Sequence, residues 1–220
     1  MTEGKAVVIG DSLNRILKPG LKVLDIGSST HSYRTTTKPH INKEIYQRIL
    51  NRGCSITSID YKSGEGVDIS GDIFSTSIQK KISDEGGDVL LCNNVAEHVE
   101  DEEGLLKILS GFEVKYIIFS VPFDYPYHQD PIDNLYRPNE RELAQAFPNY
   151  QNIRSQTVAS ITFWDALKKL NPPVAVFRIG KEFFRVCYWI LTLKFKHIRY
   201  SRLFWLIKPY RTTVALYEMN

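Results

Sequence analysis

Histidine and carboxylate residues in the middle of the chain have side chains suited to proton transfer. His98 follows Glu97, and His128 lies five residues before Asp133 in a polar stretch that also contains Asp130. A neutral imidazole accepts a proton near neutral pH because its ordinary pKa is about 6.5. We expect His128 to be a general base oriented by Asp133 or Asp130, unless one of these carboxylates is itself the base. His98 is the competing base, although it could equally tie its loop to a neighbouring loop by hydrogen bonds.

The same side chains could ligate a metal ion, but their spacing does not favour one. Glu97 and His98 are adjacent, His128 is far along the chain, and no pair with the spacing His-x-x-x-His occurs. Metal sites in proteins commonly show such short, regular ligand spacing. The sequence therefore predicts no metal.

These residues must be positioned by alternating strands and helices. Apolar, β-branched runs alternate with helical patterns, and this alternation is typical of a mostly parallel sheet with helices on both faces and an antiparallel last strand. The expected strands are 21–27, 54–60, 66–73, 88–94, 114–122, 152–160 and 212–218. The expected helices are 42–51, 102–109 and 140–147. Ligands of such sheets bind beyond the carboxyl ends of the strands, so function is expected there.

Polar residues follow these strands where a ligand would bind. Gly27 and Ser28 come after the first strand and leave room for a close backbone approach. Asp60 ends the second strand, where a carboxylate can accept hydrogen bonds from both hydroxyls of a ribose. Asp72 follows the third and could accept from an adenine amino group. Each signal alone is equally consistent with an ordinary turn, loop or helix cap.

Taken together, the ordered motifs VLDIGSS, ITSID, GDI, DVLLCNNVAEHVED and IIFSVP resemble those of the class I S-adenosylmethionine-dependent methyltransferases. The stretch SVPFDYPYHQDPIDNLYRPNERELAQAF is similar to the subgroup that methylates oxygens of small molecules and sugars. The resemblance implies a Rossmann-like fold, S-adenosylmethionine as cofactor and S-adenosylhomocysteine as product. By this resemblance Asp25, Gly27 and Ser28 line the methionine part of the cofactor. Asp60 would hold its ribose, Asp72 would meet its adenine, and Asn93 would lie near the sulfonium.

The acceptor is expected to be a small molecule or a saccharide. Tyr33 and Arg34, in the long polar loop after the first strand, and Tyr136 and Arg137, before the helix at 140–147, are the expected acceptor-binding residues. One departure from the family pattern is Ser29, which occupies the place of a second glycine. The alternative hypothesis is therefore a non-catalytic module that binds cofactor, a membrane or a partner protein.

Charge is distributed unevenly along the chain. The net charge is +3, but residues 175–220 hold 9 Lys and Arg against 2 Asp and Glu, together with 11 of the 26 aromatic residues. The basic aromatic segment 178–208 is interpreted either as a helix packed on the sheet or as an element that contacts anionic membrane. Nucleic acid is disfavoured because the rest of the chain is acidic.

The chain is expected to form one methyltransferase domain, 1–220. Residues 161–210 make a basic, aromatic, helical elaboration between its last two strands. Three scattered cysteines and no long apolar run indicate a cytosolic protein with reduced, buried thiols. A membrane-peripheral position is the alternative if the basic aromatic segment contacts lipid.

Overall fold

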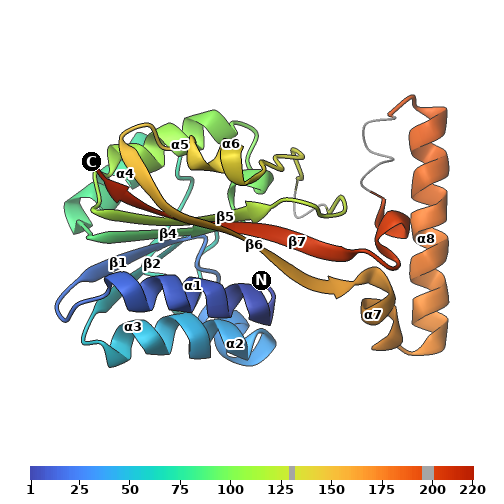
Figure 1. The fold of residues 1–220 in the computed structure, drawn as a ribbon, viewed down its shortest axis with the longest axis horizontal. Helices are drawn as coiled ribbons and strands as arrows, with labels where there is room; N and C mark the ends of the chain where they lie inside the picture. The colour runs from blue at the N-terminus through green and yellow to red at the C-terminus, as the bar shows by residue number, and fades with distance from the viewer. Residues whose placement is uncertain (129–131, 195–200) are drawn as a thin grey trace.

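The computed structural model describes residues 1–128, 132–194 and 201–220, and a seven-stranded sheet forms its centre (Figure 1). Among the described strands, β7 alone runs in the direction opposite to the other six. From one edge to the other the strands are β3 (Ile69–Ser70), β2 (Ser55–Asp60), β1 (Lys22–Ile26), β4 (Val89–Asn93), β5 (Tyr116–Pro122), β7 (Pro209–Met219) and β6 (Tyr150–Thr162). The predicted mostly parallel, Rossmann-like sheet with an antiparallel last strand is confirmed.

Helices cover both faces of the sheet because its central strands are apolar on both sides. In β1, for example, Val23 faces one hydrophobic cluster and Leu24 the other, and both are buried. One face is covered by α1 (Glu3–Ile16), α2 (Pro39–Ile41), α3 (Gln47–Asn51) and the π-helical turns η1 (Tyr33–Thr37) and η2 (Asn42–Tyr46) (Figure 1). The other face is covered by α4 (Thr76–Glu85), α5 (Glu102–Gly111) and α6 (Glu140–Ala144).

The long hairpin of β6 and β7 extends beyond the sheet, and a helical segment connects the two strands in the region where the sequence predicts an elaboration, 161–210 (Figure 1). This segment consists of α7 (Phe163–Lys168), α8 (Pro172–Leu191) and the 3-10 helix η4 (Arg202–Trp205). A small separate core holds it together, made of Phe163, Leu167, Trp205 and Tyr210. Residues 195–200 of the predicted basic aromatic segment lie outside the described residues.

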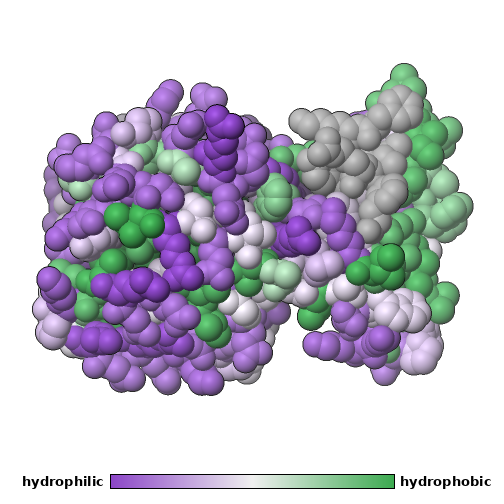
Figure 2. Space-filling view, in the orientation of Figure 1, coloured by the Kyte–Doolittle hydropathy of each residue, from purple (hydrophilic) through white to green (hydrophobic). Residues whose placement is uncertain are grey.

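Helix α8 differs from the interpretation of a helix packed on the sheet. Of its twenty residues only Glu182 and Trp189 are buried, and its main neighbour is η4. Figure 2 shows hydrophobic residues gathered over this helix at one end of the molecule. Cys187 is accordingly only half-buried, whereas Cys54 and Cys92 are buried as predicted. No described helix is both long and apolar enough to cross a bilayer.

The order of the elements agrees with the sequence patterns, and their lengths differ in places. The third strand is only two residues long, and the last two strands are longer than predicted. Helices α1 and α4 were not predicted. α1 is important for the site because its N-terminal end reaches the carboxyl end of β4, as the hydrogen bond from Lys5 to Asn94 shows.

Candidate active site

The turn after β1 is joined to the end of β2 by backbone hydrogen bonds. The N–H groups of Gly27 and Ser28 both donate to the carbonyl of Ile59, at 2.8 and 3.1 Å. Gly27 has a φ of 78°, and a Cβ there would lie 2.4 Å from Cγ2 of Val95. Only glycine adopts this positive φ without strain and also leaves the space beside Val95 free. This geometry explains the glycine of the motif independently of any ligand.

Ser29 adopts the left-handed conformation at the place where the motif that this turn resembles has a second glycine. Its φ is 59°, and its N–H donates to Oδ2 of Asp60 at 2.8 Å. The other oxygen of Asp60 accepts the N–H of Lys62 at 3.0 Å. A carboxylate oxygen has two lone pairs, so Asp60 keeps acceptor capacity for further hydroxyl donors. A serine therefore fits this turn because the Asp60 carboxylate holds it in place.

Behind the turn, Asp25 lies in a buried polar network that the sequence did not predict. The hydroxyl of Tyr46 donates to Asp25, and Nη1 of Arg34 donates to that hydroxyl at 2.9 Å. Burial raises the pKa of Asp25 to about 6, against the opposing effects of Tyr46 and Arg34. Arg34 also donates to the carbonyls of Ser29, at 3.1 Å, and Gly66, at 2.8 Å. The network thus fixes the loops that follow β1 and β2.

The other residues assigned to the cofactor also follow strands of the sheet. Asp72 is exposed, and its Oδ1 accepts the N–H of Phe74 at 3.0 Å in the turn before α4. Asn93 ends β4, and its Oδ1 accepts the hydroxyl of Ser120 at 2.6 Å. Their cofactor-binding roles stay predictions, as do those of Asp25, Gly27, Ser28 and Asp60.

Helix α1 places a buried lysine, Lys5, near the carboxyl end of β4. Lys5 is fully buried and its ammonium donates to the side chain of Asn94. Burial lowers the pKa of Lys5 to about 8 and that of the Met1 amino group to about 5. The sequence does carry a signal for this position, because Lys5 precedes the buried Ile9 by four residues and therefore lies on the same face of the helix.

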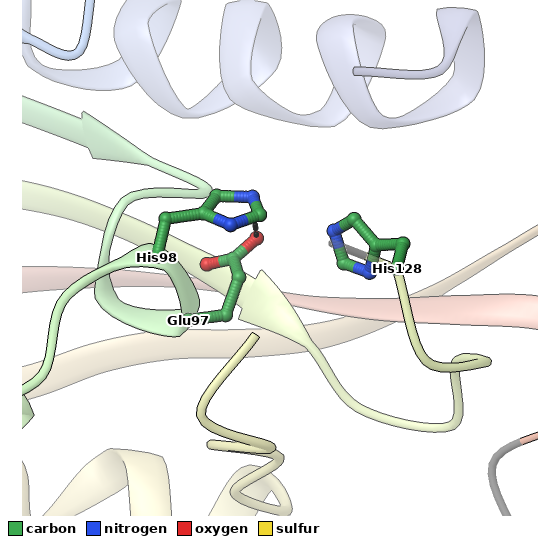
Figure 3. Close-up of side chains that lie close together, drawn as sticks. All are labelled: Glu97, His98 and His128. Atoms are coloured by element: carbon green, nitrogen blue, oxygen red, sulfur yellow. Dashed lines mark ion pairs between the residues drawn. The ribbon is translucent and has the colours of Figure 1, made fainter. Parts of the chain in front are cut away.

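Glu97, His98 and His128 meet beyond the carboxyl ends of β4 and β5 (Figure 3). The two imidazole rings stand edge to face with centroids 5.0 Å apart. Nε2 of His98 lies 3.8 Å from Oε1 of Glu97, whose side chain is completely buried. Burial raises the pKa of Glu97, against the lowering effects of His98 and Lys5. The structure thus brings together the two histidines that the sequence named as competing bases.

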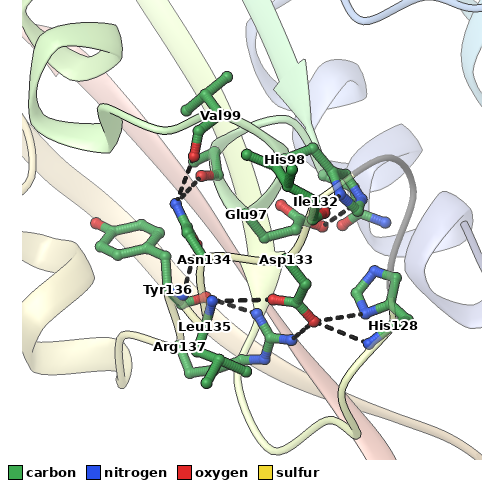
Figure 4. A network of polar contacts seen from close by, with 12 residues as sticks. Glu97, His98, Val99, His128, Ile132, Asp133, Asn134, Leu135, Tyr136 and Arg137 are labelled. Atoms are coloured by element: carbon green, nitrogen blue, oxygen red, sulfur yellow. Dashed lines mark hydrogen bonds and ion pairs between the residues drawn. The ribbon is translucent and has the colours of Figure 1, made fainter.

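A second polar network holds these histidines (Figure 4). Nδ1 of His98 lies 2.7 Å from the carbonyl of Ile132, and Nδ1 of His128 lies 3.3 Å from Oδ2 of Asp133. That same oxygen accepts Nη2 of Arg137 at 2.6 Å. Burial alone would raise the pKa of Asp133, but His128 and Arg137 outweigh it and hold the pKa well below its usual range. The predicted neighbour Asp130 lies outside the described residues.

Asn134 clamps the loop after β4 to the loop that carries Asp133. Its amide nitrogen donates to the carbonyls of Ala96 and Val99 at 2.8 and 3.0 Å, and its backbone N–H donates to the carbonyl of Glu97 at 3.0 Å (Figure 4). The sequence reasoning did not single out Asn134. Because the side chain and backbone of this one residue join both loops, the two histidines are held in a defined relationship.

The four residues predicted to bind the acceptor lie in two places. Arg137 pairs with Asp133, and Tyr136 packs against the core under α5 and α6, where burial raises its pKa to about 12. Tyr33 packs against the opposite hydrophobic cluster, and Arg34 belongs to the buried network around Asp25. Contact of these residues with an acceptor stays a prediction.

Solved structures share this fold along almost the whole chain. The [4+2]-cyclase SpnF has a TM-score of 0.55 and 13% identity, covering 96% of this chain and 80% of its own. A cyclopropane-fatty-acyl-phospholipid synthase-like protein from Lactobacillus casei has a TM-score of 0.53 and 13% identity, covering 99% and 90%. A provisionally described methyltransferase bound to the Haloferax volcanii Trm112 methyltransferase activator has a TM-score of 0.52 and 12% identity, covering 98% and 90%.

The chain therefore has the Rossmann-like fold of the class I S-adenosylmethionine-dependent methyltransferases. No protein-family model matches the sequence, and no curated protein matches it. Because a cyclase shares this fold, the reaction must be argued from the site itself.

Proposed function

We propose that this protein transfers a methyl group from S-adenosylmethionine to an oxygen of a small-molecule or saccharide acceptor. The observation that carries the proposal is the position of Asp60. Its carboxylate follows β2, is bonded to the turn after β1, and keeps acceptor capacity where a methyltransferase-type sheet would present a ribose.

In this proposal the cofactor lies across the ends of β1, β2 and β4. The ribose hydroxyls donate to Asp60, and Asp72 receives the adenine amino group. Asp25, Gly27 and Ser28 line the methionine part, with Asn93 beside the sulfonium. Gly27 supports this arrangement because it is exposed and has no side chain, so the cofactor can approach its backbone closely.

The chemistry needs little more than alignment and a proton acceptor. The acceptor oxygen attacks the methyl carbon, an O–C bond forms, the C–S bond breaks, and S-adenosylhomocysteine leaves as a neutral thioether. The hydroxyl proton passes to Nε2 of His128. The Asp133 carboxylate, which is ionised and can only accept, faces Nδ1 of His128, so the ring hydrogen lies on Nδ1 and the lone pair on Nε2.

His98 is the second candidate for the same step. Its Nδ1 faces the carbonyl of Ile132, which also can only accept, so its Nε2 likewise carries a lone pair. His128 is preferred as the base because its partner Asp133 is charged and would stabilise the imidazolium formed by proton transfer. Arg137 supports this pair by holding the Asp133 carboxylate.

We further propose that α8 docks the enzyme on a membrane surface that contains anionic lipid. Phe177, Phe184 and Leu191 recur every seven residues on one face of the helix and are 70%, 74% and 83% exposed. The exposed basic residues Arg178 and Lys181 lie beside them and would attract lipid phosphates. Such docking would favour an acceptor that is itself membrane-associated, and it makes the protein membrane-peripheral.

Transfer can be tested before the acceptor is known. Protein is incubated with S-adenosylmethionine labelled in its methyl group and with separated lipid, saccharide and small-molecule fractions of a cell extract. The proposal expects label in one fraction and an equal amount of S-adenosylhomocysteine. Cofactor binding without label transfer to any fraction would favour the non-catalytic module instead.

A further inference from the structure

We propose that Glu97, His98 and His128 bind a divalent transition-metal ion. One carboxylate oxygen and one nitrogen from each imidazole all lie within 4.8 Å of one another (Figure 3). Two imidazoles and one carboxylate form a common ligand set for such ions. The sequence analysis considered the same three side chains but predicted no metal, because His98 and His128 are thirty positions apart and no regular ligand spacing appears.

Both imidazoles present the atom that a metal needs. Nδ1 of His98 faces the carbonyl of Ile132 and Nδ1 of His128 faces the carboxylate of Asp133. Both partners are acceptors only, so each Nδ1 carries the hydrogen and each Nε2 has a free lone pair. Metal-bound histidines in proteins are typically oriented in this way by a carbonyl or carboxylate on the other nitrogen.

Glu97 supplies a second, independent observation. Its side chain is completely buried, yet neither carboxylate oxygen accepts a hydrogen bond from another residue of the described parts of the chain. A buried carboxylate without such partners is costly, and a cation is the ligand that best offsets this cost. Oε1 of Glu97 lies 3.8 Å from Nε2 of His98, which is itself a lone-pair atom.

Lys5 is the alternative source of positive charge near Glu97. Its ammonium, however, is bonded to Asn94, and no ion pair within 4.0 Å joins it to Glu97 among the described residues. Lys5 thus leaves the carboxylate oxygens available to another ligand, while its charge weakens the binding of any cation.

Small side-chain movements would complete the site. With bonds of about 2.1 Å, neighbouring ligand atoms of a bound ion lie about 3 to 3.5 Å apart. The present separations of up to 4.8 Å require each side chain to move by about 1 Å. Three protein ligands leave at least one open coordination position.

If the proposed function holds, the open position takes the acceptor hydroxyl. The ion lowers the pKa of that hydroxyl, its proton is lost to water, and the resulting alkoxide attacks the methyl carbon. In this mode the Nε2 lone pair of His128 is a ligand rather than the proton acceptor. Binding of the ion itself does not depend on the proposed function.

The test is a Co²⁺ titration of protein without a histidine tag, freed of metal by a chelator. We expect one Co²⁺ per chain, a visible absorption band and competition by Zn²⁺. The variants E97Q, H98Q and H128Q should each weaken binding at least tenfold. H31Q, which removes an exposed histidine on another loop, should bind as the wild type does. Circular dichroism shows whether each variant is folded, and E97Q preserves the shape of the buried side chain.

Absence of Co²⁺ binding by the wild type, or equal weakening in H31Q, would overturn the site. Failure of the proposed function would appear separately, as Co²⁺ binding without S-adenosylmethionine binding or methyl transfer. Full transfer by chelator-treated protein would overturn the role of the ion in the reaction. Transfer that is lost with chelator and restored by Co²⁺ or Zn²⁺ would support it.

Discussion

The carboxylate of Asp60 accepts the backbone N–H of Ser29 at 2.8 Å, and this hydrogen bond joins the ends of two neighbouring strands. It holds Ser29 in a left-handed conformation at the place where the motif that this turn resembles has a glycine. The bond therefore explains how the turn keeps its shape without its second glycine, and it aligns Asp60 with the turn that would cover the cofactor.

Gly27→Ala should destabilise the fold more than Gly20→Ala. Both glycines have positive φ, 78° and 89°, so both variants pay about 1 to 2 kcal/mol for the left-handed backbone. Only at Gly27 does the new Cβ meet Val95, at 2.4 Å, while nothing lies within 4 Å of a Cβ at Gly20. We expect an additional loss of about 1 to 3 kcal/mol for Gly27→Ala in urea unfolding. Equal losses would contradict the packing described for this turn.

Asp25 should make the free energy of unfolding depend on pH. Its pKa is about 6 in the folded protein, and the pKa of an aspartate in an unfolded chain is about 3.9. Between these two pH values Asp25 is protonated in the folded state but ionised in the unfolded state. The free energy of unfolding therefore falls as pH rises from about 4 to about 6, and Asp25 causes no further change above pH 6. The full change is about 3 kcal/mol. Urea unfolding of Asp25→Asn without cofactor should lack this component, and an unchanged pH profile in the variant would refute the assignment.

His128→Ala should lower methyl transfer without weakening cofactor binding. Loss of a general base costs about 10²- to 10⁴-fold in rate, whereas the imidazole is not among the groups assigned to the cofactor. Label transfer to the acceptor fraction and calorimetric titration with S-adenosylmethionine measure the two effects separately. Full transfer by the variant would remove His128 from the reaction, provided that the chemical step limits the rate.

Replacing Phe177 and Phe184 by serine should reduce binding to vesicles that contain phosphatidylserine. Burial of a phenylalanine side chain contributes about 1.5 to 3 kcal/mol, so even partial insertion of both predicts at least a tenfold loss. Leu50→Ser is the matched control, because Leu50 is 57% exposed in α3, away from α8. The fraction of protein bound to vesicles is measured by flotation at low and at high salt. Binding that is equal for all three proteins would argue against docking through α8.

The sheet could be predicted because its strands are short apolar runs that end in recognisable residues. Gly27 and Asp60 mark the ends of the first two strands. The order of strands and helices along the chain is enough to indicate the fold class. Lys5 and Tyr46 could not be placed in the same way. Their partners, Asn94 and Asp25, are distant in sequence, and only tertiary packing brings them together.

The cluster around Glu97 shows the same limit for the site. The sequence identified His98 and His128 separately, but their meeting depends on β5 and on the clamp by Asn134. Helix α8 shows a different limit. Its pattern of apolar residues predicts a helix with one buried face, but the pattern does not say which element covers that face. In the structure most residues of α8 are exposed.

Calorimetric titration of the purified protein with S-adenosylmethionine tests the central claim most directly. We expect one binding site per chain and at least tenfold weaker binding by Asp60→Ala, because that variant loses the carboxylate proposed to hold the ribose. Asp84→Ala, which removes an exposed carboxylate of α4, should bind as the wild type does. No binding by the wild type, or an affinity unchanged by Asp60→Ala, would contradict the account.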